Sequence, residues 1–258
     1  MARFNITLPA ALAALPVWLA LTLGISTWER GGHPQSLAEA AGGSIGLGWV
    51  AAALFALIIT LAAPDRRTAG LTRPSCLRLT WLPLSFALLM LLLTWAGDFP
   101  DTRTTIIIAC NTALVALSEE LMFRSILLQG MLTRFPLLPS VLASSAIFGV
   151  VHAANGFSTG DMQTALWQSL AAALQGVGYA AIRIRTGSVW PMVLIHGLWD
   201  FSLMASAISA ASQNETSTLP AASLLIVLPL FLYGLYLLRP GAAVTVLRTS
   251  SPAPDSPR

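Results

Sequence analysis

Long apolar stretches are the feature that most constrains this chain. A segment that crosses the hydrocarbon core of a membrane needs about 20 mostly apolar residues in a helix, because only a helix satisfies its own backbone hydrogen bonds there. About eight windows fit this requirement. They lie near 4–27, 43–63, 79–97, 104–132, 138–152, 162–184, 188–209 and 219–238. We therefore predict an all-α polytopic membrane protein, a bundle of about eight transmembrane helices.

The composition agrees with this class. The 258 residues are 55% hydrophobic and only 10% charged, and the mean hydropathy is +0.73. A soluble domain of this length rarely has such values. No segment combines aromatic and basic residues, so the basic balance does not indicate a nucleic-acid partner. The two cysteines, Cys76 and Cys110, fall in a loop and an apolar helix, so we expect no disulfide between them.

The arginines predict the orientation in the membrane, because positive charge marks cytoplasmic loops. They gather in alternate connections, at Arg66, Arg67, Arg73, Arg78, Arg134, Arg183, Arg185 and in the last 20 residues. The intervening connections are neutral or acidic. We expect both termini in the cytoplasm and the protein in a bacterial inner membrane. An alternative is that the first window is a cleaved signal peptide, since Arg3 precedes an apolar run.

The chain divides into four predicted parts. Residues 1–103 hold about three N-terminal helices, 104–209 hold the polar motifs, and 210–238 hold the last helix. Residues 239–258 are rich in Pro and Ser, so we expect a disordered cytoplasmic tail.

A cluster of ionisable residues interrupts the apolar sequence of the helix predicted at 104–132. Glu120 and Arg124 are four residues apart and share a helix face, so they are expected to pair and to brace the helix. Glu119 points about 100° away and lacks such a partner on its own helix. It is therefore expected to meet a group from another helix.

Two later helices supply histidines. His152 follows Phe148 by four residues, and His196 precedes Asp200 by four, so each pair shares a face. Charged groups at membrane depth cost about 3 kcal/mol on insertion scales, which favours a functional site over chance. A carboxylate and an imidazole can activate water as a general base, and a second imidazole can stabilise an oxyanion. Alternatively, Glu119, His152 and His196 could hold a zinc ion.

These three elements, EELMFR, FGVVH and HGLWD, resemble the CPBP family of intramembrane proteases, the CAAX prenyl endopeptidases and bacteriocin-processing enzymes. The family pattern is Glu-Glu-x-x-x-Arg, then Phe-x-x-x-His, then His-x-x-x-Asn or His-x-x-x-Asp. The stretch RTGSVWPMVLIHGLWDF also resembles the family's last motif. The resemblance covers about 104–209 and implies a hydrolase that cleaves a membrane-associated peptide.

Carried onto this sequence, the resemblance implies that Glu119 and His152 activate water and that His196 and Asp200 support the oxyanion. Glu120 and Arg124 match positions that shape the site. An ionised Asp200 accepts hydrogen bonds and cannot donate one, so its direct oxyanion role is open. It can instead orient His196, be protonated, or ligate a metal.

Substrates in the family include prenylated Cys-a-a-X tails, which lose their last three residues, and bacteriocin-like peptides. Nothing in the sequence selects between them. Several large side chains are interpreted as packing or as the lining of a lipid groove: Met122, Phe123, Trp167, Trp190 and Trp199. A non-catalytic binding or immunity protein of the same fold, and a proton-coupled transporter, are the alternative functions.

Overall fold

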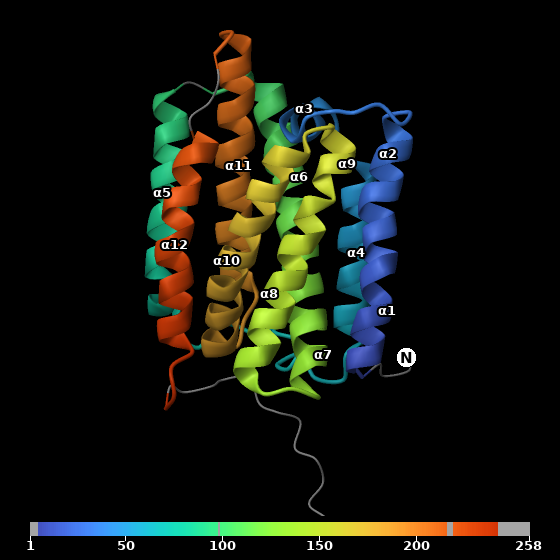
Figure 1. Cartoon of the computed structure of the whole chain (residues 1–258), viewed down its shortest axis with the longest axis vertical. Helices are drawn as coiled ribbons and strands as arrows, with labels where there is room; N and C mark the ends of the chain where they lie inside the picture. Colours follow the sequence, from blue (N-terminus) through green and yellow to red (C-terminus); the bar gives the residue numbers. More distant parts are fainter. Residues whose placement is uncertain (1–4, 98, 216–218, 242–258) are drawn as a thin grey trace, which may run out of the picture.

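The structure is a computed structural model that describes residues 5–97, 99–215 and 219–241, apart from the side chains of 219–224. Its helices run side by side along one axis (Figure 1). Within the described residues there is no β-strand, only an isolated bridge between Leu71 and Ser188. The predicted all-α class is therefore confirmed.

Every predicted window coincides with a helical segment. The first comprises α1 (Leu8–Leu19), the π-helical η1 (Ala20–Ile25) and α2 (Ser26–Glu29). Next come α3 (Leu37–Gly43), α4 (Leu47–Ala62), the 3₁₀ turn η2 (Leu77–Thr80) and α5 (Trp81–Ala96). The motif region holds α6 (Thr102–Glu120), the π-helical η3 (Leu121–Leu127), α7 (Leu128–Leu132), α8 (Leu137–Ala153) and α9 (Asn155–Thr159). It continues with α10 (Met162–Thr186) and α11 (Trp190–Ser212), and α12 (Leu219–Leu237) follows.

Fewer helices meet the length and hydropathy of a membrane span than the eight expected. Within the described residues five do, or up to six if α3 and α4, which meet at 87°, form one broken span. The helix α10 is absent from this set because three glutamines and two arginines interrupt its apolar sequence. For α12 the apolar part with described side chains, Leu225–Leu237, is short. The part of the chain that the structure describes thus holds five or six helices that are long and apolar enough to cross a membrane, as expected for an integral membrane protein.

Two helices of the motif region start at the same kind of cap. Asp101 begins α6 and Asp161 begins α10, and each carboxylate accepts a backbone N–H from the residue three positions later. The hydroxyls of Thr104 and Thr164 also donate to these carboxylates, both at 2.6 Å. These hydrogen bonds hold the pKa of Asp101 and of Asp161 below the usual value. A side-chain acceptor at this position satisfies amides that the helix leaves unpaired.

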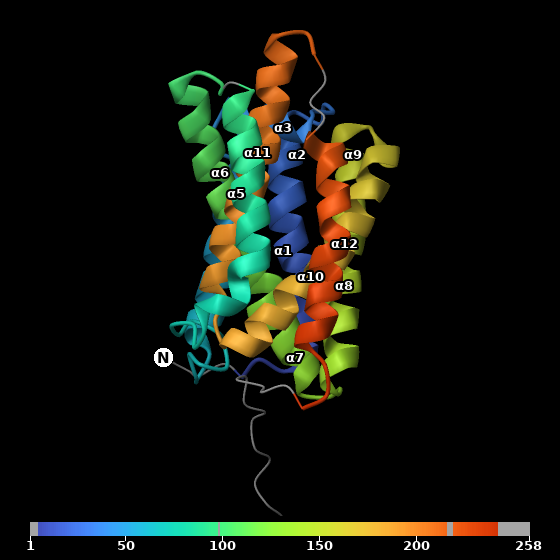
Figure 2. The same ribbon diagram turned by 90° about the vertical axis from the view of Figure 1, so that its left-hand side faces the viewer.

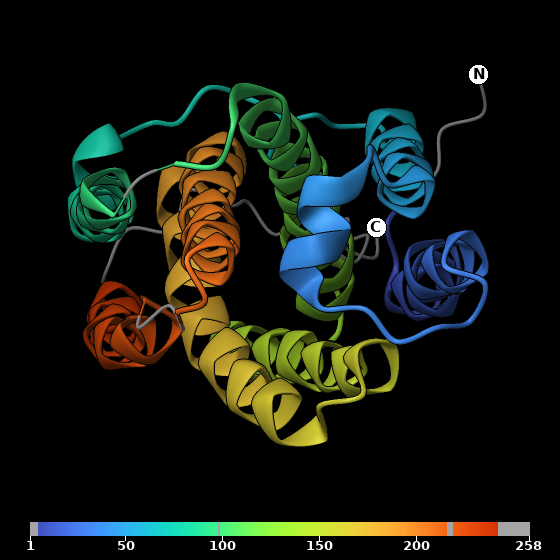
Figure 3. The ribbon, with the colours of Figure 1, turned by 90° about the horizontal axis from the view of Figure 1, so that it is seen from above.

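Four helices occupy the middle of the bundle. Viewed from above, α6, α8, α10 and α11 surround the centre, with α5 and α12 on one side and α1 and α4 on the other (Figure 3). The view in Figure 2 shows α5 in front of α11 and α12 beside α10. The other helices therefore flank the motif-bearing helices on these two sides, while the outer faces of α8 and α10 stay exposed, for example at Val150 and Trp167.

A glycine and a proline define the turn between α10 and α11. Gly187 ends α10 with a left-handed φ of +71°, and Pro191 lies in the first turn of α11. One prediction here is wrong. Arg183 and Arg185, expected in a cytoplasmic linker, lie within the last turns of α10, and Arg183 is only 1% exposed.

The tail predicted from residue 239 lies almost entirely outside the described residues.

Candidate active site

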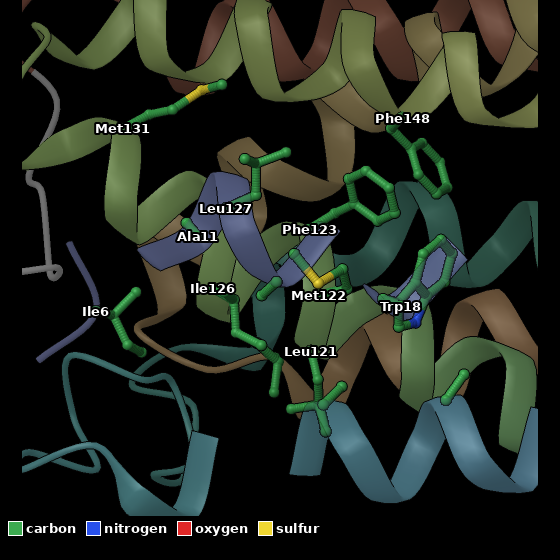
Figure 4. Close-up of a cluster of buried hydrophobic side chains, with 14 of the residues drawn as sticks. Ile6, Ala11, Trp18, Leu121, Met122, Phe123, Ile126, Leu127, Met131 and Phe148 are labelled. Atoms are coloured by element: carbon green, nitrogen blue, oxygen red, sulfur yellow. The ribbon is translucent and has the colours of Figure 1, made fainter. Parts of the chain in front are cut away.

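The helix that carries the glutamate pair is fixed by packing against α1. The indole of Trp18 donates to the hydroxyl of Ser118 at 2.7 Å, and its ring meets Phe123 edge-on at 5.5 Å. Figure 4 shows Trp18, Phe123 and Phe148 in the same apolar cluster. Because Ser118 precedes Glu119, this anchoring sets the direction in which both glutamates project.

A π-helical segment, η3, begins directly after Glu120. The apolar pattern of residues 104–132 predicted one uninterrupted α-helix and gave no sign of this segment. In a π-helix the backbone hydrogen bonds run from residue i to i+5, so each hydrogen-bonded turn holds one residue more than in an α-helix and the helix is wider. Such turns are frequent at functional sites. Residues 121–127 are all buried, so the wider turn lies in the core of the protein.

Glu119 meets both histidines, as its unpaired position on the helix predicted. One carboxylate oxygen, Oε2, lies 3.8 Å from Nε2 of His152 and 3.6 Å from Nε2 of His196. These separations exceed a direct hydrogen bond, and the side chain of Glu119 stays 12% exposed. The groups are thus close enough to contact one small molecule together.

Glu120 is fully buried and has two partners. Its Oε2 lies 3.3 Å from Nε of Arg124, which is the brace predicted from the sequence. Its Oε1 accepts a hydrogen bond from Nδ1 of His196 at 2.9 Å. This second contact was not predicted, because a pattern within one helix says nothing about which distant histidine reaches it. Glu120 therefore fixes the orientation of His196.

His152 is oriented by its own helix. Its Nδ1 donates to the carbonyl oxygen of Phe148 at 2.8 Å. A carbonyl only accepts, so the ring hydrogen lies on Nδ1 and the lone pair of the neutral ring lies on Nε2, which faces Glu119. The Phe148 ring lies 4.5 Å from the His152 ring and 6.2 Å from the His196 ring. Phe148 thus packs edge-on against both histidine rings.

Asp200 lies on the other side of His196. Its Oδ2 is 3.4 Å from Nε2 of that residue, and its side chain is 24% exposed, more than those of Glu119 and His196. His196 therefore has carboxylates beside both ring nitrogens. Such a setting suits an imidazolium, which carries a hydrogen on each nitrogen.

Tyr179 is a site residue that lies outside the three sequence motifs. Its ring lies 5.7 Å from that of His196 and 5.6 Å from the guanidinium carbon of Arg124. Arg124 also sits 4.2 Å from the centre of the Phe148 ring. Cation–π contacts of this kind help to hold a buried guanidinium. The only available signal was a lone tyrosine in the middle of the apolar part of α10.

The three predicted zinc ligands come together, because Oε2 of Glu119 lies within 3.8 Å of Nε2 of both His152 and His196. In the part of the chain that the structure describes, no group of three or more His, Cys, Asp or Glu side chains is placed to hold a metal ion. One nitrogen of His196 is committed to Glu120, and one nitrogen of His152 to a backbone carbonyl. Both of these bonds use Nδ1, and a metal-bound histidine is commonly oriented through its other ring nitrogen in the same way, so the zinc ligand set stays a prediction.

The large side chains considered for a lipid groove divide into two groups. Met122, Phe123 and Trp199 are buried and pack within the bundle. Trp167 and Trp190 are exposed by 55% and 41%. The indole of Trp190 donates to the carbonyl of Leu71, which ties it to the connection between α4 and α5. Most of this set therefore serves packing and anchoring.

A cavity of about 450 Å³ lies elsewhere, near α2, α3 and the start of α4. Its polar lining includes Glu29, His33 and Glu39. Glu29 accepts the backbone N–H of Leu47, and Glu39 accepts that of Ser36. These carboxylates cap local turns, so the cavity does not belong to the site around Glu119.

Residues 101–202 match the model of the family described as type II CAAX prenyl endopeptidase Rce1-like. This region resembles the CAAX endopeptidases. The match confirms the resemblance inferred from the three motifs and spans α6 to most of α11, the helices that carry every residue of the site. No curated protein matches the chain.

Proposed function

We propose that the protein is an intramembrane endopeptidase that hydrolyses a peptide bond of a membrane-associated substrate. The observation that carries the proposal is the meeting of Glu119 with His152 and His196 from three helices, within 3.8 Å. The CAAX-type family match supports the same class of reaction. Prenylated tails and bacteriocin-like peptides are both candidate substrates.

In the proposed reaction, Glu119 is the general base. A water held between Glu119 and Nε2 of His152 loses a proton to the carboxylate while its oxygen attacks the peptide carbonyl carbon. The C–N bond then breaks, and Glu119 returns the proton to the leaving amine nitrogen. The products are a carboxylic acid and an amine, and transfer of the acid proton to the amine leaves a carboxylate and an ammonium group, so atoms and protons balance.

His196 supports the oxyanion in this scheme. With Nδ1 donating to Glu120, the imidazolium form presents an Nε2–H toward the developing negative charge. Asp200, 3.4 Å from Nε2, favours that charged form and orients the ring. Asp200 can orient His196 in this way as an ionised carboxylate. A direct hydrogen bond to the oxyanion would instead require a protonated Asp200.

The test is cleavage of a membrane-anchored peptide library by purified protein in detergent. Glu119→Gln should lose at least about a hundredfold in activity, since general-base catalysis contributes that much. Glu39→Gln, an exposed carboxamide variant outside the site, is the matched control. Parental activity in Glu119→Gln would overturn the assignment of the base.

Metal analysis of the same preparation, with activity measured in chelator, decides the open question of zinc. The side-chain mechanism expects full activity after chelation. Activity lost with chelator and restored by zinc would require a metal mechanism instead.

A further inference from the structure

Aromatic and basic side chains gather at one end of the bundle, where α5 begins and α12 ends. The ring of Trp81 meets that of Tyr233 edge-on at 6.2 Å, and the near-parallel rings of Tyr233 and Tyr236 are 6.4 Å apart. The guanidinium carbon of Arg239 lies 3.9 Å from the centre of the Tyr236 ring. The hydroxyl of Tyr233 donates to the carbonyl of Leu79 at 3.0 Å, which ties α12 to the turn before α5. These contacts make one continuous cluster.

The cluster is open at the surface of the bundle. Trp81 is 60% exposed and Tyr236 is 57% exposed, and the side chains of Arg78 and Arg239 are exposed as well. The helices α5 and α12 are neighbours (Figure 3), and further along them lie exposed leucines: Leu88, Leu92, Leu228 and Leu232. Aromatic rings with a polar edge are typical of the depth at which lipid headgroups meet hydrocarbon. The cluster therefore has the composition of a membrane–water interface.

The two exposed arginines keep hydrogen-bond donors without partners. No described carboxylate forms an ion pair with Arg78 or Arg239. Arg239 donates through Nη1 to the carbonyl of Tyr236 at 2.8 Å, and no described residue accepts from its Nε or Nη2. Nearby, Arg185 donates to the carbonyl of Leu237 at 3.0 Å and so holds the end of α12 beside α10. The cluster thus presents positive charge and free N–H groups to an external anion.

We propose that this cluster binds the headgroup of an anionic phospholipid. The guanidinium of Arg239 is already positioned over Tyr236, and its free N–H groups donate to the phosphate. Arg78 adds a second cation from the turn before α5. Basic pockets between transmembrane helices recognise anionic headgroups in this way. A lipid is favoured over a soluble anion because its acyl chains also cover the exposed leucines of α5 and α12. The inference is independent of the proposed proteolysis.

Native mass spectrometry of the purified protein tests this site by counting retained lipids. Phosphatidylglycerol and phosphatidylcholine with the same acyl chains are added at equal concentrations. The wild type should bind the anionic lipid roughly thirtyfold more tightly, since each arginine near the membrane surface contributes about fivefold. Arg78→Gln and Arg239→Gln should each lower this preference about fivefold, and the double variant should bring it near one.

Two further variants separate a specific site from an effect of net charge. Arg66→Gln is the matched control, because this exposed arginine follows α4 on the side of the bundle opposite α5 and α12 (Figure 3). It should keep the wild-type preference. Tyr236→Leu removes the ring beneath Arg239 without changing the charge, and it should lower the preference about twofold to fivefold. A loss in Arg66→Gln as large as that in Arg239→Gln would overturn the inference, as would equal retention of the two lipids by the wild type.

Inorganic phosphate distinguishes a lipid site from a site for a free anion. At millimolar concentration it should leave the bound phosphatidylglycerol in place, because the acyl chains supply much of the affinity. Displacement of the lipid by phosphate would overturn its assignment as the ligand. All substituted side chains are exposed, so each variant should melt like the wild type in detergent without added lipid.

Discussion

At the scale of single residues, the adjacent glutamates have different surroundings and should respond differently to substitution. Glu119→Gln changes a group whose neighbours lie 3.6 Å or more away, so the protein should keep its melting temperature while losing activity. Glu120→Gln removes the charge that pairs with Arg124 and holds His196. Breaking a buried pair of this kind costs about 3 to 5 kcal/mol.

Thermal unfolding of both variants in one detergent measures this contrast. Equal melting temperatures for the two variants would show that Arg124 and His196 find other partners.

Gly70 offers a second residue-scale prediction. Gly70→Ala combines a left-handed φ with a Cβ in contact with the Arg183 guanidinium, so it should destabilise by more than about 1 kcal/mol. Gly32→Ala is the matched control, since its φ of +79° is the same but its Cβ meets nothing within 4 Å. Melting curves that place Gly70→Ala no lower than Gly32→Ala would contradict the close contact with Arg183.

At the scale of helices, the approach of α8 to α10 depends on Gly149. A Cβ there would lie 2.6 Å from the backbone oxygen of Ser169, which cannot move without shifting the helix. Gly149→Ala should therefore cost about 1 to 3 kcal/mol and reduce activity, because His152 lies one turn further along α8. Gly24→Ala, whose Cβ meets nothing within 4 Å, is the control. If Gly149→Ala unfolds and turns over substrate like the wild type, α8 and α10 can move apart without loss of stability or activity.

The caps of α6 and α10 predict a pH dependence. The folded pKa of Asp101 is lowered, so its stabilising effect is complete above the unfolded value near 3.9 and is lost as pH falls through the folded value. The difference in melting temperature between wild type and Asp101→Ala should thus shrink as pH falls from about 5 toward 3. Asp101→Asn keeps an acceptor without a titrating group and should remove most of this dependence. A difference that is constant with pH would mean that the ionised carboxylate does not cap α6.

At the scale of the whole molecule, the arginine distribution predicts the direction of insertion. Cys76, in the basic connection before α5, should react with an impermeant thiol reagent in inverted membrane vesicles but not in intact cells. A Cys110→Ser background leaves this cysteine as the single target. Adding His33→Cys supplies a control that should be labelled from the opposite side. Labelling of Cys76 from outside intact cells would show that the protein has the opposite orientation in the membrane.

The sequence was sufficient to predict the long helices and two of the contacts in the candidate site. Apolar length located these helices to within a few residues, though not the short α3 and α9, and four-residue spacing placed Glu120 beside Arg124 and His196 beside Asp200. Both signals are local, because they depend only on helix geometry.

Long-range contacts could not be predicted in this way. The bond from His196 to Glu120 joins residues 76 positions apart, and Tyr179 enters the site from a fourth helix. Arg183 was assigned to a loop because a charge near the end of an apolar run usually marks one. Its burial depends on the Gly70 backbone, more than 100 residues earlier in the chain.

The π-helical segment after Glu120 also has an evolutionary consequence. A π turn differs from an α turn by one residue, so it is what a single-codon insertion into an ordinary helix leaves behind. Deleting one residue within 121–127 would restore regular helix and rotate everything before it by about 100° relative to α7. Glu119 and Glu120 would then no longer point toward the two histidines, although the helix would still cross the bundle. One small deletion would thus be enough for a lineage to keep the helix bundle and lose the candidate active site.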